Sequence, residues 1–200
     1  MNPYGQAGWT SSGGSSSSYP SLAPSVYGAL PFSGSSSSSS NDFLLTFHFA
    51  FNPTITNCTV TGPNSRTYFR ITDNAPSPGF TLFQNSEGKS VAIIEWRRSP
   101  GHVVEIRDIV QKQLVSTWLA ISRDQTYRTM NARGLTLVWT ARDNYVGLFT
   151  TGTSSVQCYA KIIRGSGSLT LQMTSQAVQL GLLEPCVVAA VLLQSGRQID

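Results

Sequence analysis

The feature that most constrains this chain is an apolar run close to its C-terminus. Residues 186–193 read Cys-Val-Val-Ala-Ala-Val-Leu-Leu and contain no polar residue. A helix that is apolar on every side must be enclosed by protein or lie in lipid. The helix that we predict over residues 181–194 is roughly 20 Å long, which is short of a hydrocarbon core of about 30 Å. The run therefore predicts an enclosed helix and no transmembrane segment.

Short β-prone segments fill the chain before this run. About ten to twelve of them follow one another at roughly 8 to 14 residues, the spacing of antiparallel strands joined by hairpins. A sandwich fills its core with its own side chains, whereas a wider barrel has room for a helix. Pro185 suits the first turn of that helix and Gly196 suits its end. We therefore predict a mainly β fold, a closed antiparallel β-barrel of about 10–12 strands around a C-terminal apolar helix.

Composition divides the chain into two parts. Residues 1–41 are rich in Ser, Gly, Pro and Tyr, and residues 1–40 carry no charged side chain. Such a segment cannot bury enough apolar surface to offset the entropy of ordering, so it predicts a disordered tail. It lacks the basic and apolar regions of a secretory signal. The folded domain is expected over residues 42–200.

Charge and cysteine content exclude several classes of function. The chain has 14 Lys and Arg against 10 Asp and Glu, and these are spread along it rather than clustered. A nucleic-acid partner is therefore not expected. The three cysteines have neither disulfide nor zinc-site spacing. We predict an intracellular, cytoplasmic monomer with no metal or other cofactor.

Candidate catalytic residues are few. His48 alternates with Phe47 and Phe49, so it is expected to face solvent. Glu95 and Glu105 could face each other across a hairpin, but the expected arrangement is two outward side chains paired with neighbouring arginines. No recognised catalytic motif is present. The chain is predicted not to be an enzyme. The alternative, that it is an enzyme, requires a cavity at the barrel mouth where His102 and a carboxylate converge.

The best candidate for a binding site is Trp96-Arg97-Arg98, with Arg107 within reach across the turn at residues 99–101. Three guanidinium groups beside an indole could hold a phosphate or an anionic headgroup. The opposing interpretation is that Trp96 packs inward while the arginines extend into water. Two other tryptophans are predicted to fill the core, and these are Trp118 and Trp139.

Several of these segments together resemble a known family. They are the opening strand with its Asn-Pro break (45–53), Tyr-Phe-Arg-Ile (68–71), Ala-Ile-Ile-Glu-Trp (92–96), Tyr-Arg (127–128), the strand 135–139 and the ending 183–193. Their order is similar to a fungal domain family of unknown function in the tubby C-terminal-like superfamily. The resemblance implies a β-barrel around a central C-terminal helix.

The resemblance implies no ligand site. Tubby-type relatives are associated with phosphoinositide binding through basic residues of the barrel, but no motif here corresponds to those residues. We therefore predict an uncharacterised, non-catalytic binding or scaffold module. The alternatives are peripheral binding of anionic phospholipid headgroups and an enzyme of unknown class.

Overall fold

A computed structural model describes residues 44–152 and 155–200. The predicted tail, residues 1–41, lies outside the described residues. The described part is mainly β, as predicted, with thirteen strands and a C-terminal helix.

The strands are short and follow one another with tight connections. In chain order they are β1 (Leu44–Phe51), β2 (Cys58–Thr61), β3 (Thr67–Asp73), β4 (Phe80–Asn85), β5 (Ser90–Glu95), β6 (Val103–Ile106), β7 (Val110–Leu114), β8 (Leu119–Ile121), β9 (Tyr127–Ala132), β10 (Leu135–Ala141), β11 (Val146–Thr150), β12 (Cys158–Gly165) and β13 (Ser168–Thr174). The helices are η1 (Pro63–Ser65), α1 (Val115–Trp118), α2 (Ser175–Gln179) and α3 (Leu183–Gln194).

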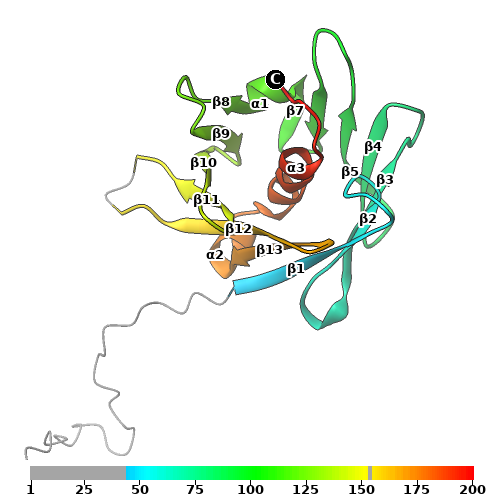
Figure 1. Cartoon of the computed structure of the whole chain (residues 1–200). Coiled ribbons are helices and arrows are strands. Elements are labelled where there is room, and N and C mark those ends of the chain that lie inside the picture. Colours follow the sequence, from blue (N-terminus) through cyan, green and yellow to red (C-terminus); the bar gives the residue numbers. More distant parts are fainter. Residues whose placement is uncertain (1–43, 153–154) are drawn as a thin grey trace, which may run out of the picture. The chain divides into compact units, whose positions relative to one another are not determined.

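All thirteen strands form one antiparallel sheet in the order β7-β6-β5-β4-β3-β2-β1-β13-β12-β11-β10-β9-β8. Neighbours in the sheet are neighbours in sequence everywhere except at β1 and β13. There the first strand pairs with the last, for example Phe47 opposite Leu171. This long-range pairing joins two meanders into one sheet, which curves around α3 (Figure 1).

The helix α3 is buried on all its sides along its middle turns. From Cys186 to Leu192 no residue is more than 1% exposed. These side chains belong to the same core as inward-facing residues of the sheet, such as Phe47 and Trp139. The predicted enclosed helix is therefore confirmed, beginning at Leu183 instead of residue 181. No helix in the described part of the chain has the length and apolarity needed to cross a bilayer.

The two edge strands of the sheet are not joined by hydrogen bonds, so the prediction of a closed barrel is not confirmed. These strands are β7 and β8, and the chain between them forms the single turn α1. Val115 and Trp118 of α1 are buried, and the Val115 N–H donates to the His102 carbonyl (2.8 Å). The helical turn α1 thus lies between β7 and β8, which do not pair with each other. We call this opening the seam.

Local predictions agree with several details of the fold. His48 is exposed between buried Phe47 and Phe49, and Trp118 and Trp139 are each 2% exposed. Gly196 has φ of +71° directly after α3, which is the left-handed conformation that favours glycine at a helix end.

Glu95 is the exception among the predicted surface charges, because it is only 5% exposed. It does not face Glu105, which lies opposite Ile93. Arg97 and Lys112 both donate to its carboxylate, linking β5 to β7. Burial would raise the pKa of Glu95, but the hydrogen bond and charge of Lys112 and the charge of Arg97 outweigh it and lower the pKa. The predicted pairing of Glu95 with a neighbouring arginine is confirmed for Arg97. The prediction that the Glu95 side chain points outward into solvent is wrong, because its carboxylate is buried between Arg97 and Lys112.

The enclosure of α3 makes the fold sensitive to charge inside the helix. We expect Val188→Asp to abolish cooperative folding, because an unpaired carboxylate in a dry interior costs several kcal/mol. Leu192→Ala, which leaves a cavity, should lower the free energy of unfolding by about 2–5 kcal/mol. Thermal melts followed by circular dichroism would measure both. Gln176→Asp on the exposed side of α2 is the control, and a similar loss there would contradict the account.

The ion pairs of the buried Glu95 carboxylate with the half-exposed Arg97 and Lys112 predict a pH dependence. Glu95→Gln should lower the free energy of unfolding by about 1–2 kcal/mol near neutral pH, since two cations lose their partner. Because the folded pKa is lowered, this difference should be complete above the ordinary pKa of 4.5 and vanish as pH falls through the lowered value. Urea titrations at several pH values would measure it.

The matched control for that experiment is Glu87→Gln. Glu87 and Lys89 form an ion pair of 2.8 Å in which both side chains are more than 60% exposed. Such a pair contributes about 0–1 kcal/mol. Equal effects of the two substitutions, or a Glu95→Gln effect that persists in acid, would contradict the role given to Glu95.

Candidate functional site

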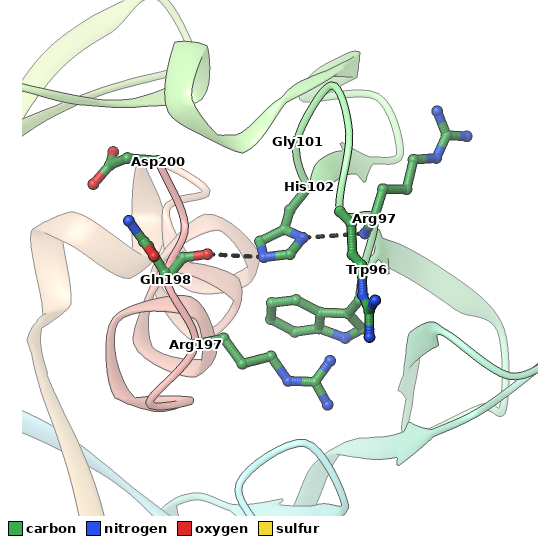
Figure 2. Close-up of a pocket in the computed structure, with 8 residues that line it drawn as sticks. Trp96, Arg97, Gly101, His102, Arg197, Gln198 and Asp200 are labelled. Carbon is green, nitrogen blue, oxygen red and sulfur yellow. Dashed lines mark hydrogen bonds between the residues drawn. The ribbon is translucent and has the colours of Figure 1, made fainter.

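The main candidate site is a pocket at the end of the sheet where α3 stops (Figure 2). Its volume is about 440 Å³. One wall comes from the connection between β5 and β6, and the other from the C-terminal segment, residues 196–200. We call it the arginine pocket, and its lining residues are Trp96, Arg97, Arg98, Gly101, His102, Arg197, Gln198 and Asp200.

Trp96 is fixed at the inner side of this pocket. Its indole N–H donates to Thr81 Oγ1 (2.7 Å), and the Thr81 hydroxyl donates to Asp73 Oδ1 (2.8 Å). Thr81 is fully buried, so this chain of hydrogen bonds ties the indole to the sheet. Trp96 is half-buried against the core, and its ring also forms one side of the pocket.

His102 connects the two walls. Its ring meets the Trp96 indole edge to face, with centroids 5.0 Å apart. The Arg97 main-chain N–H donates to Nδ1 (3.1 Å), so Nδ1 carries no proton and Nε2 does. Nε2–H then donates to the Gln198 carbonyl (2.9 Å), as Figure 2 shows. Both ring nitrogens are therefore occupied by main-chain groups.

The C-terminal segment brings a further arginine into the site. The Arg197 guanidinium lies 4.2 Å from the centre of the Trp96 ring, a cation–π contact (Figure 2). It is also 3.6 Å from Asp73 Oδ2, which is an ion pair at the long end of the range. Ile199 is 7% exposed and packs into the core. The segment is thus held by apolar, aromatic and hydrogen-bonded contacts together.

Asp200 extends the same segment across the seam. Its carboxylate accepts two hydrogen bonds from Arg128 of β9 (2.8 and 2.5 Å), and Arg128 also donates to the Leu119 carbonyl of β8 (2.9 Å). The hydrogen bonds from Arg128 lower the pKa of Asp200. Since Gln198 is bonded to His102 beside β6, residues 196–200 link the two sides that the sheet leaves unpaired.

The arginine pocket carries an excess of positive charge. Arg97 shares the single carboxylate of Glu95 with Lys112, and Asp200 is neutralised by Arg128. Arg98 is exposed and has no carboxylate within ion-pair distance in residues 44–152 and 155–200. Arg98 and the loosely paired Arg197 therefore remain to attract an anion.

Arg107 does not join the other predicted site residues. Its main-chain N–H donates to Val91 O (2.8 Å), at the far end of β5 from Trp96. At about 3.3 Å per residue this is about 17 Å from Trp96. The expectation that Arg107 reaches Trp96 is wrong because β6 runs antiparallel to β5 and carries Arg107 away from the turn. It lies beside Glu105 in a separate hollow.

Three residues of the pocket were not predicted from the sequence, and these are Arg197, Gln198 and Asp200. The signal that could have found Arg197 is a single basic residue directly after the apolar run and its terminating glycine. Among the residues that the structure describes, no group of three or more His, Cys, Asp or Glu side chains could hold a metal ion.

Comparison with known proteins identifies a family. Among curated proteins, no sequence matches this chain. One solved structure, an X-ray structure of a protein from Arabidopsis thaliana, is similar with a TM-score of 0.41 and 10% identity, covering 78% of this chain and 93% of that one. A family model described as "Family of unknown function (DUF6593)" matches residues 52–199. The chain, with most of its length matched, belongs to this family of unknown function.

Proposed function

We propose that this chain is a non-catalytic binding module that holds a phosphate-type anion in the arginine pocket. The observation that carries the proposal is that Arg98 and Arg197 line the same pocket, together with the Trp96 ring on which Arg197 lies. Arg98 has no carboxylate within ion-pair distance among the described residues, and the Arg197–Asp73 pair is long at 3.6 Å, so an anion would gain charge-assisted hydrogen bonds without breaking a short ion pair. The planar fork of arginine suits the oxygens of a phosphate.

Rigid surroundings support this use of the pocket. Trp96 is held through Thr81, and His102 is held between the Arg97 and Gln198 main chains. Arg197 lies on a ring whose position is therefore fixed. A preorganised site loses little conformational entropy when a ligand binds.

The state of His102 supports the non-catalytic part of the proposal. A general base needs a free nitrogen lone pair, and Nδ1 of His102 is occupied by the Arg97 N–H. The Asp200 carboxylate points away from the imidazole (Figure 2). The two buried thiols are also unsuited to chemistry, since burial raises the pKa of Cys58 to about 12 and also raises that of Cys186.

We also propose that the family lies within the tubby C-terminal-like superfamily and that the chain is fungal. The support is the order of the sequence segments described above, together with a single antiparallel sheet curved around an apolar C-terminal helix. The anion site proposed above, the arginine pocket, lies at the end of this sheet and not on its outer face.

The second candidate function is the recognition of anionic phospholipid headgroups. It uses the same chemistry, because a headgroup phosphate and a soluble phosphate present the same oxygens to Arg98 and Arg197. The exposed position of Arg98 at the rim of the pocket favours it, since a bilayer can reach such a group.

The proposal predicts that inorganic phosphate and methyl phosphate bind to the protein. We expect Arg98→Gln to weaken binding at least about tenfold, because charge-assisted hydrogen bonds are lost. Arg197→Gln should weaken phosphate binding as strongly. The melting temperature of this variant should be measured as well, because Arg197 also contacts Trp96 and Asp73. Isothermal titration calorimetry at low salt would measure the affinities.

The matched control is Arg164→Gln, which removes the same charge from an exposed position of β12 outside the pocket. Equal weakening by this control, or no binding of either phosphate to the wild-type protein, would contradict the proposal. Flotation with neutral and phosphoinositide-containing vesicles then identifies the source of the anion. If the phosphoinositide-containing vesicles retain the wild-type protein and Arg98→Gln abolishes this retention, the anion is a lipid headgroup. If these vesicles do not retain the wild-type protein, the anion is a soluble phosphate.

A further inference from the structure

A second, apolar hollow lies at the same end of the sheet. It measures about 190 Å³ and is formed by β8 to β11 and the last turn of α3. We call it the apolar hollow. Its larger apolar lining residues are Ile121, Tyr127, Trp139, Val146 and Leu193, and its polar ones are Gln125, Thr126, Arg128 and Gln194.

This hollow gathers apolar surface that the fold leaves in water. Ile121 is 40% exposed and Tyr127 is 41% exposed, and both belong to the small set of large apolar side chains with such exposure in the described residues. The connection between them is internally bonded, since Ser122 Oγ donates to Asp124 (2.6 Å) and Thr126 Oγ1 donates to the same carboxylate (2.9 Å). The two side chains are therefore presented by a well-ordered turn.

The apolar hollow and the arginine pocket share a boundary. Asp200 lines the arginine pocket, Arg128 lines the apolar hollow, and these two residues form the bidentate ion pair described above. The Arg128–Asp200 ion pair therefore lies where the cationic site and the apolar site meet.

We propose that the ligand of this end of the sheet is an anionic amphiphile, with its phosphate in the arginine pocket and its alkyl chain in the apolar hollow. The inference rests on the proposed function, to which it adds the chemical class of the ligand. Charge complementarity selects the orientation, because Arg98 and Arg197 attract the anion while the apolar hollow offers no cation except Arg128, which Asp200 already neutralises.

The size of the hollow limits the chain that it can cover. Its volume of 190 Å³ is below that of the clefts of about 300–1,000 Å³ that enclose drug-sized ligands. The hollow therefore covers a short stretch of an alkyl chain, and further methylenes extend into solvent. Each methylene that leaves water contributes about fourfold to affinity, the equivalent of about 0.8 kcal/mol.

A chain-length series tests the inference. The probes are inorganic phosphate and methyl, butyl, hexyl and decyl phosphate, each below its micelle concentration and titrated calorimetrically. We expect affinity to rise about fourfold per methylene over the shorter members and then to level off. Ile121→Ser with Tyr127→Ser should reduce the gain per methylene below about twofold and leave the affinity for inorganic phosphate unchanged.

Leu44→Ser is the control, since Leu44 is similarly exposed (45%) but lies on β1 outside both hollows. If all probes bind with the affinity of inorganic phosphate, or if the gain survives Ile121→Ser with Tyr127→Ser, the amphiphile inference is overturned while the anion site stands. If no probe binds, the proposed anion site itself falls, and the inference falls with it. Arg98→Gln should weaken every member of the series by the same factor.

Discussion

The enclosure of α3 by the sheet is the interaction on which the rest of the molecule depends. A helix with buried residues on every side has no face to offer to water, so the strands must surround it. The pairing of β1 with β13 makes this possible, because it joins two meanders into one curved sheet. Neither meander alone would cover the helix, and the helix in turn fills the space that a curved sheet of this width leaves inside.

The position of α3 also determines where the candidate site lies. The helix ends at one end of the sheet, and Gly196 turns the chain back over the rim. Residues 197–200 then contact Trp96, His102 and Arg128, which belong to both sides of the seam. The contacts that hold the two unpaired sides together therefore also form a wall of the arginine pocket, and one of them, the Arg128–Asp200 ion pair, lies where this pocket meets the apolar hollow. Stability and binding are expected to be coupled through these few residues.

Local patterns in the sequence predicted what depends on local physics. The apolar run predicted α3, alternation placed His48 outside, and Gly196 marked the end of the helix. The seam was not predicted, because α1 is a single turn whose two buried side chains are determined by tertiary packing. Arg107 was misplaced because its distance from Trp96 depends on strand direction, and Arg197 was missed because its contact with Trp96 crosses 100 residues of sequence.

Native-state hydrogen exchange of the α3 amides tests the central claim most directly. If the sheet encloses the helix, the amides of residues 186–192 can exchange only when the whole domain unfolds. Their opening free energy should then equal the global free energy of unfolding and fall with denaturant at the same slope. Exchange of these amides through a local opening several kcal/mol below the global value would show that the helix can leave the sheet, and would contradict the account.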